Sequence, residues 1–200
     1  MNALIRLVIV GLVATQLAGC AAVVVGAAVA TGVAVHDRRS VGTVIDDNVL
    51  ELQVREAIHE GDTFQDRTRI KVSAFNGWVL LAGEVPYKDL IEEATTRASS
   101  VDGVQRLFNE LAVAERASFG EASNDRWIAG RVKASFTGVR GLPGFDPTRV
   151  SVTATRGVVY LQGLVSQAES DAVIEQARTV RGVEREVTLF DLSYSDSTAQ

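Results

Sequence analysis

The sequence predicts an α+β fold made of two tandem copies of one αββαβ unit, each a three-stranded mixed sheet with two helices on one face. Two observations support this expectation. The first is an internal repeat at a constant offset of 80, which relates RIKVSAFNGWVLLAGEV at 69–85 to RVSVTATRGVVYLQGLV at 149–165. The second is that apolar residues change between the helical and the strand period in the same order in both copies.

The first copy, residues 46–114, opens with a predicted helix. Apolar residues recur on one helical stripe over 50–58, and Asp46, Asp47 and Asn48 precede it. These side chains can cap a helix N-terminus and favour its positive end. We therefore expect the helix to begin at this point.

Two strands, a second helix and a third strand follow in the first copy. Residues 70–74 alternate between apolar and polar, and Asn76-Gly77 is a strong signal for a two-residue hairpin turn. Pro86 can begin the second helix. Residues 107–113 alternate again and predict the third strand.

The second copy, residues 123–192, follows the same order. It predicts a helix from about Asp125, strands near 149–155 and 158–164, a helix near 167–180 and a strand near 184–192. Residues 115–122 form a short link, and residues 193–200 look like a disordered tail. Because a core of about 70 residues is marginal by itself, we expect the two copies to pack on each other, or at least to be closely tethered.

The N-terminus reads as a secretory signal peptide over residues 1–19. Arg6 precedes a short apolar run that is too short to span a bilayer comfortably. The run ends in Leu17-Ala18-Gly19-Cys20, which resembles the lipobox of bacterial lipoproteins. The resemblance implies cleavage before Cys20 and acylation of its sulfur and new amino terminus. The alternative is a free core cysteine behind an uncleaved anchor.

Residues 20–45 then form a lipidated N-terminus and linker. The apolar segment 21–35 could lie at the membrane surface, act as a flexible tether or pack on the body, and we favour the first two together. Arg38 and Arg39 could meet anionic headgroups or simply be solvated. Residue 21 is not aspartate, which by resemblance to Gram-negative lipoproteins implies the outer membrane.

Composition excludes several classes of function. Without residues 1–19 the chain keeps 19 basic and 25 acidic side chains, a net charge of −6, which excludes a generally basic nucleic-acid binder. Cys20 is the only cysteine, so no disulfide framework or thiolate metal cluster can form. The two histidines have no metal-ligand spacing, and no Ser-His-acid or Cys-His set can be assembled. We expect no enzyme, no metal and no cofactor.

The two copies differ in charge. Residues 46–114 carry 7 basic and 13 acidic side chains, whereas residues 123–192 carry 9 basic and 8 acidic ones. The first helix of the second copy combines Trp127, beside its core stripe, with Arg126, Arg131 and Lys133. An aromatic ring among cations is typical of a helix that lies at a membrane interface. We assign these four residues to binding of anionic phospholipid; the alternative is that Trp127 packs against the other repeat.

The hairpin pattern, with a helix that ends in Val-x-Gly-Val, resembles BON domains. It appears at 72–83 and at 152–163, followed by 101–104 and 180–183. Almost the whole chain resembles the dual-BON outer-membrane lipoproteins. The resemblance implies a non-enzymatic, lipid-anchored protein facing the periplasm, which binds phospholipid and supports outer-membrane integrity, as at division sites. The alternative is an interaction scaffold that uses the first copy to bind outer-membrane assembly machinery or regulators of cell-wall hydrolases.

Overall fold

The computed structural model describes residues 37–61, 63–64 and 67–194, and the chain from Arg38 onward forms one compact unit. The predicted signal peptide, Cys20, the apolar segment 21–35 and residues 195–200 lie outside the described residues. No helix in the described part of the chain combines the length and the apolar character needed to cross a bilayer.

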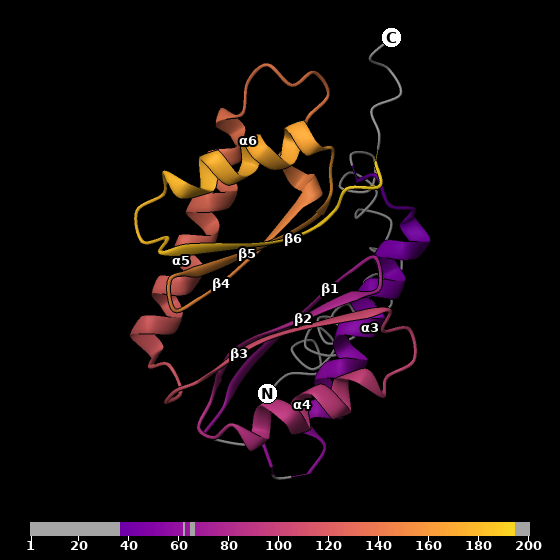
Figure 1. Ribbon diagram of the computed structural model, residues 1–200, viewed down its shortest axis with the longest axis vertical. Helices are drawn as coiled ribbons and strands as arrows, with labels where there is room; N and C mark the ends of the chain where they lie inside the picture. The colour runs from indigo at the N-terminus through magenta and orange to yellow at the C-terminus, as the bar shows by residue number, and fades with distance from the viewer. Residues whose placement is uncertain (1–36, 62, 65–66, 195–200) are drawn as a thin grey trace, which may run out of the picture. The chain divides into compact units, whose positions relative to one another are not determined.

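The first repeat has the predicted order αββαβ (Figure 1). Its elements are α3 (Val41–His59), β1 (Arg69–Phe75), β2 (Trp78–Val85), α4 (Asp89–Ser99) and β3 (Arg106–Val113). Strand β2 pairs antiparallel with β1 and parallel with β3, so the sheet is mixed, with the order β1-β2-β3. The second helix begins three residues later than Pro86, at Asp89.

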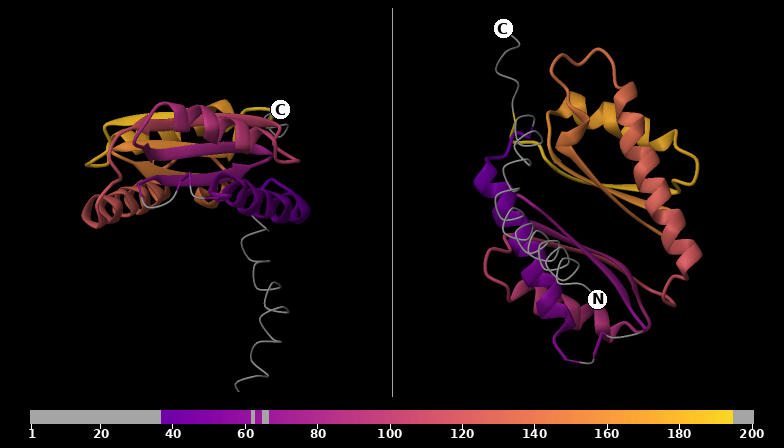
Figure 2. Two further views of the ribbon diagram at one scale, coloured as in Figure 1. Left: turned by 90° about the horizontal axis from the view of Figure 1, so that it is seen from below. Right: turned by 180° about the vertical axis from the view of Figure 1, so that it is seen from behind.

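The second repeat reproduces this topology with the order β4-β5-β6. Its elements are α5 (Phe119–Ser135), η2 (Phe136–Gly138), η3 (Pro147–Arg149), β4 (Val150–Thr155), β5 (Val158–Leu164), α6 (Gln167–Arg178) and β6 (Arg185–Asp191). The views of Figure 2 show that the two helices of each repeat cover one face of that repeat's own sheet. The predicted α+β class and the tandem αββαβ order are confirmed.

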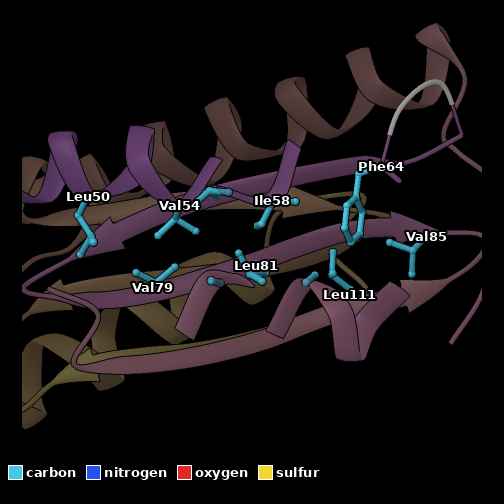
Figure 3. Packing of buried hydrophobic residues seen from close by; sticks show 11 residues of the cluster. Leu50, Val54, Ile58, Phe64, Val79, Leu81, Val85 and Leu111 are labelled. Atoms are coloured by element: carbon cyan, nitrogen blue, oxygen red, sulfur yellow. The ribbon is translucent and has the colours of Figure 1, made fainter. Parts of the chain in front are cut away.

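Each repeat has its own hydrophobic core between the helices and the sheet. In the first repeat Leu50, Val54 and Ile58 of α3 point onto Val79 and Leu81 of β2 (Figure 3). The second repeat builds the equivalent core from α5, η2 and β5, with the residues Ile128, Val132, Phe136, Val159 and Leu161. The apolar stripes that the sequence predicts are therefore the buried faces of both first helices.

The N-terminus of α3 corrects one expectation. The helix begins at Val41, and the cap is Ser40, whose hydroxyl accepts a hydrogen bond from the backbone N–H of Thr43 at 3.0 Å. The Asp46–Asn48 segment therefore lies inside the helix and does not cap it. Serine is a strong N-cap residue, but Ser40 lies ten residues ahead of Leu50, the first residue of the predicted stripe, so the stripe gave no indication of it.

Asp47 instead caps the hairpin turn between β1 and β2. Its carboxylate is buried and accepts from the backbone N–H groups of Asn76 (2.7 Å) and Gly77 (2.9 Å). Both turn residues have positive φ, 51° and 73°, as the Asn-Gly pair predicts. The helix thereby fixes the turn of the hairpin on which it packs.

Arg38 and Arg39 are neither solvated nor free to meet headgroups. Arg39 forms an ion pair with Asp47 at 2.7 Å and stacks over the ring of Phe75. Arg38 makes two hydrogen bonds to the Glu169 carboxylate, at 2.5 and 2.9 Å. Both expectations for this pair of residues were wrong, because their partners come from distant parts of the fold that no local pattern reveals.

The sheet faces that the helices leave open pack on each other. Leu80 and Ala82 of the first sheet form one buried cluster with Tyr160 and Leu189 of the second. Burial raises the pKa of the Tyr160 hydroxyl. The two repeats are thus one folded unit, as the small size of each core predicts.

Candidate lipid-binding face of helix α5

Helix α5 begins earlier than the sequence analysis predicts. Ser118 is the N-cap, and it forms a capping box with Glu121, whose carboxylate accepts from the Ser118 backbone N–H at 2.8 Å. The Ser118 hydroxyl and backbone hydrogen bonds lower the pKa of Glu121. The expected start near Asp125 was wrong, and half of the predicted link 115–122 is the first turn of the helix.

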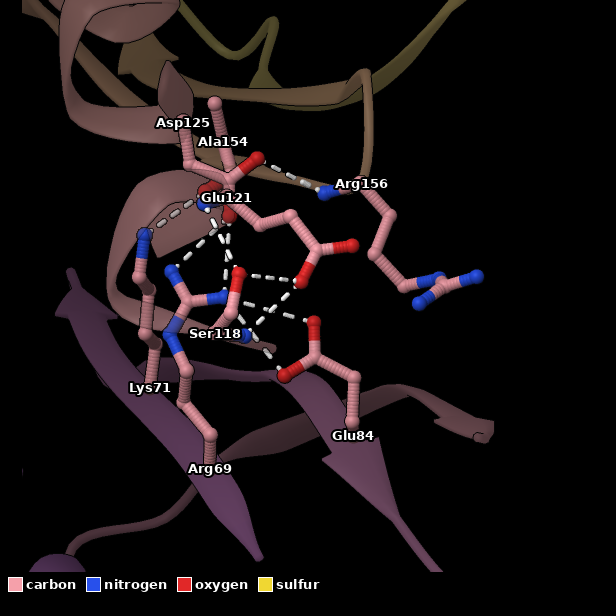
Figure 4. Close-up of polar contacts among 8 residues, drawn as sticks. All are labelled: Arg69, Lys71, Glu84, Ser118, Glu121, Asp125, Ala154 and Arg156. Atoms are coloured by element: carbon pink, nitrogen blue, oxygen red, sulfur yellow. Dashed lines mark hydrogen bonds and ion pairs between the residues drawn. The ribbon is translucent and has the colours of Figure 1, made fainter. Parts of the chain in front are cut away.

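The inner face of α5 is tied to the hairpin of its own repeat through Asp125. One carboxylate oxygen accepts from the backbone N–H of Arg156 at 2.9 Å, in the turn between β4 and β5 (Figure 4). Asp125 is equivalent to Asp47, 78 residues earlier, and both carboxylates hold the same turn. Arg156 and Gly157 adopt the same positive φ values as Asn76 and Gly77.

Asp125 also ties α5 to the first repeat. Its other oxygen accepts hydrogen bonds from Nη1 and Nη2 of Arg69, at 2.9 and 2.8 Å. Arg69 lies in β1 and also faces the fully buried carboxylate of Glu84 at 3.3 Å. Figure 4 shows this guanidinium between the two carboxylates. A partly buried cation between two buried anions needs all three groups in place, so the cluster fixes how the repeats meet.

Lys71 extends the contact between the repeats. Its ammonium donates a hydrogen bond to the backbone oxygen of Ala154 at 2.6 Å. Burial, followed by the neighbouring charge of Arg69, lowers the pKa of Lys71. Strand β1 therefore contacts two elements of the second repeat, α5 through Arg69 and β4 through Lys71.

The outer face of α5 presents Trp127. The side chain is 52% exposed, and the guanidinium of Arg131 lies 4.5 Å from the ring centroid. Arg126 and Arg131 are exposed, and at 3.6 residues per turn they lie on either side of Trp127. Trp127 does not pack against the other repeat, since its ring lies on the face opposite to the buried residues of α5. The structure therefore brings three of the four predicted lipid-binding residues together at the surface.

Lys133 is placed differently from the other three. Its ammonium donates to the backbone oxygen of Pro147 at 2.7 Å and to that of Val150. These bonds hold the start of β4, so the charge of Lys133 serves the fold.

Sequence reasoning missed an exposed aromatic residue on this helix, Phe119. It lies in the first turn of α5 and is 85% exposed. With Trp127 it gives the outer face of this helix two large rings. The repeat offset of 78 could have revealed it, because Phe119 aligns with Val41 at the start of α3.

Within the described residues no group of three or more His, Cys, Asp or Glu side chains is placed to hold a metal ion. A groove of about 560 Å³ in the second repeat lies between the first half of α5 and the hairpin turn. Glu121, Asp125, Arg156 and Glu184 line it, and Asp125 is already engaged by the turn.

Comparison with known proteins agrees with this architecture. The family model described as "BON domain" matches residues 46–115 and 124–188. The outer membrane lipoprotein DolP of Haemophilus influenzae is 34% identical over 174 residues, which cover 87% of this chain and 89% of that protein. A protein named 21 kDa hemolysin, of Actinobacillus pleuropneumoniae, is 35% identical over 155 residues, 78% of each chain.

Among solved structures, CdsD of the Chlamydia trachomatis type III secretion system matches with a TM-score of 0.28 and 11% identity. The match covers 71% of this chain and 91% of that one, and a likeness this low carries no argument. The family model and the DolP sequence do carry one, since each spans most of the chain and the model matches once in each repeat. The chain belongs to the BON-domain family, as a two-domain member of the DolP type.

Proposed function

We propose that this protein is a non-enzymatic lipoprotein of the outer membrane, anchored through Cys20, whose body binds anionic phospholipid through the outer face of α5. The observation that carries the proposal is the half-exposed Trp127 with Arg126 and Arg131 on its two flanks. An indole ring enters the headgroup layer while the two guanidinium groups meet phosphates.

The charge of the two repeats supports this choice of helix. Residues 123–192 have a net charge of +1 and residues 46–114 a net charge of −6. Anionic headgroups therefore repel the first repeat and attract the basic surface of α5. Bound to the membrane, the body adds its own contact to the anchor and concentrates the protein where anionic lipid is abundant, such as division sites.

Co-sedimentation of residues 37–200 with vesicles of phosphatidylethanolamine and phosphatidylglycerol tests the proposal. The exposed half of the Trp127 side chain corresponds to about 110 Å² of surface. If membrane binding removes this surface from water, it contributes about 2.7 kcal/mol to the binding free energy at about 25 cal/mol per Å². Trp127→Ala retains part of that area, so we expect about a 30-fold loss of vesicle affinity.

Val49→Ala is the matched control, because Val49 occupies the position of α3 that is equivalent to Trp127. It should leave vesicle binding unchanged. Binding of the natural chain should also fall with added salt. Equal binding by Trp127→Ala would show that another surface of the body binds the vesicles, and no binding by the natural body would show that the anchor alone holds the protein to membranes. Either result overturns the proposal for α5.

A second candidate function is favoured by one observation on the first repeat. Helix α3 carries four exposed aliphatic residues on one face, next to a groove with acidic residues. This surface suits an interaction scaffold for outer-membrane assembly machinery or for regulators of cell-wall hydrolases. Such a function would survive Trp127→Ala.

A further inference from the structure

The outer face of α3 is an aliphatic stripe that packs against no other element among the described residues. It consists of Val41, Ile45, Val49 and Leu52, which are 49–56% exposed. At 3.6 residues per turn these four side chains lie within about 80° of one another. The buried residues of α3 lie on the opposite side, so the stripe takes no part in the core. We call these four residues the α3 stripe.

The duplication shows that this stripe is a specific feature of the first repeat. At an offset of 78, the equivalent positions of α5 are Phe119, Ser123, Trp127 and Gly130. Both helices bury equivalent inner positions. At the four outer positions α5 presents two rings, with Arg126 and Arg131 beside Trp127, whereas α3 presents an aliphatic side chain at every one. The two repeats therefore have equivalent cores but different exposed helix surfaces.

The charges around the α3 stripe are acidic. Asp46 and Glu56 are exposed beside it, and the repeat as a whole has a net charge of −6. Arg55, the one basic residue within 46–60, is in an ion pair with Glu51 at 2.6 Å. An anionic bilayer would be repelled here. A cationic partner would be attracted.

The stripe continues into a groove of about 500 Å³. Val49 belongs to both, and Asp46, Gln53, Asp102 and Gln105 line the groove beside it. The described part of the chain offers no hydrogen bond or ion pair to the carboxylates of Asp46 and Asp102. An acidic groove next to the α3 stripe can receive a basic side chain of a segment that packs along this stripe.

We propose that the α3 stripe and this acidic groove dock a cationic amphipathic helix of a partner protein. Aliphatic residues of the partner at a spacing of three and four would pack along Val41, Ile45 and Leu52. Lysine or arginine side chains of the partner would lie against Asp46 and Asp102. This inference deepens the scaffold function proposed above and does not depend on lipid binding by α5.

The test is a fluorescence-anisotropy titration of residues 37–200 against a labelled designed helix with a leucine seam and lysine flanks. The matched probe has glutamate in place of every lysine. We expect the lysine probe to bind at least about tenfold more tightly than the glutamate probe at low salt. Absence of binding by the lysine probe, or equal binding by both probes, overturns the proposal.

Variants locate the binding surface. Ile45→Ser with Leu52→Ser should weaken the lysine probe at least about tenfold, and Asp46→Asn with Asp102→Asn should weaken it about threefold at low salt only. Trp127→Ala is the control and should bind the probe as the natural chain does. If the variant with Ile45→Ser and Leu52→Ser binds the lysine probe with an affinity within twofold of that of the natural chain, the proposal is overturned.

The same variants separate this inference from the proposal for α5. Circular dichroism should show that each variant is folded, because all the substituted residues are exposed. Trp127→Ala should lose vesicle binding and keep the probe, and the Ile45, Leu52 variant should do the reverse. Loss of vesicle binding by the Ile45, Leu52 variant would assign the stripe to the membrane. Concentration-dependent self-association of the natural chain that this variant removes would assign it to a second copy. Either result overturns the proposal.

Discussion

Replacement of Asp125 by asparagine should weaken both the second repeat and its attachment to the first. The variant keeps an oxygen for the Arg156 backbone N–H but loses the charge that faces Arg69. Hydrogen bonds to charged groups contribute about 1.5–3 kcal/mol each. Arg69 retains Glu84 at 3.3 Å, so we expect a loss of about 2 kcal/mol in the free energy of unfolding.

Arg69→Gln should cost more than Asp125→Asn. It leaves Glu84, which is fully buried, and Asp125, which is 3% exposed, without the cation between them. Removal of one partner from a buried ion pair typically costs about 3–5 kcal/mol. Since the whole domain is stable by only about 5–15 kcal/mol, this variant should be close to unfolding at ordinary temperature.

The assay is urea denaturation of residues 37–200, followed by far-ultraviolet circular dichroism and by tryptophan fluorescence. Trp78 reports on the first repeat and Trp127 on the second, so single-tryptophan variants follow each repeat separately. The control is Arg178→Gln, which breaks a pair with Glu186 whose arginine is 58% exposed. An exposed pair should contribute little to stability.

Two results would refute the role assigned to this cluster. One is a midpoint for Asp125→Asn no lower than that of Arg178→Gln. The other is a smaller loss of stability for Arg69→Gln than for Asp125→Asn, because two uncompensated buried carboxylates should cost more than one cation that keeps a partner.

Three further predictions concern other parts of the fold. Burial alone would raise the pKa of Glu169, but hydrogen bonds from Arg38 and Ser166 lower it below its usual value. The stability that this carboxylate contributes should therefore be present above the usual pKa of glutamate and be lost as the pH falls through the lowered pKa. Urea midpoints of Glu169→Gln should lack this loss, and an equal pH dependence of the variant and the natural chain would contradict the prediction. Lys133→Gln should lower the thermal midpoint, because the Lys133 ammonium donates hydrogen bonds to backbone oxygens. Its affinity for vesicles should stay within about twofold of that of the natural chain. A loss of vesicle binding without destabilisation would return Lys133 to the lipid-binding site. Gly130→Ala should raise the free energy of unfolding by about 0.5–1 kcal/mol, because the added methyl meets nothing within 4 Å. Gly83→Ala should prevent folding, because its methyl would lie 1.9 Å from a backbone oxygen. Similar urea midpoints for the two variants would contradict both predictions.

The repeat made most of the fold predictable. Alternation over 70–74 and the helical stripe over 50–58 are local patterns that follow directly from the period of each element. Because the pattern occurs twice at a constant offset, each copy supported the reading of the other. The Asn76-Gly77 turn needed no tertiary information, since few residue pairs other than Asn-Gly favour positive φ at both positions.

Helix starts were less predictable than helix faces. Ser40 and Ser118 cap α3 and α5 well ahead of the apolar stripes. Asp47 and Asp125 looked like caps because aspartate favours helix N-termini. An aspartate inside a helix is unfavourable locally and is retained here because its carboxylate satisfies a hairpin turn about 30 residues away.

By itself, the sequence determined the αββαβ order, the duplication, the two core stripes and the position of Trp127 beside two arginines, because periodicity and composition are local properties. Only the tertiary structure decided which charges remain available at the surface. It placed Arg38, Arg39 and Lys133 on partners within the body, and it left Arg126 and Arg131 exposed on either side of Trp127. The physical reason is that an ion pair depends on which distant groups the packing of helices and sheets brings within about 4 Å, and the order of residues along one element does not contain that information.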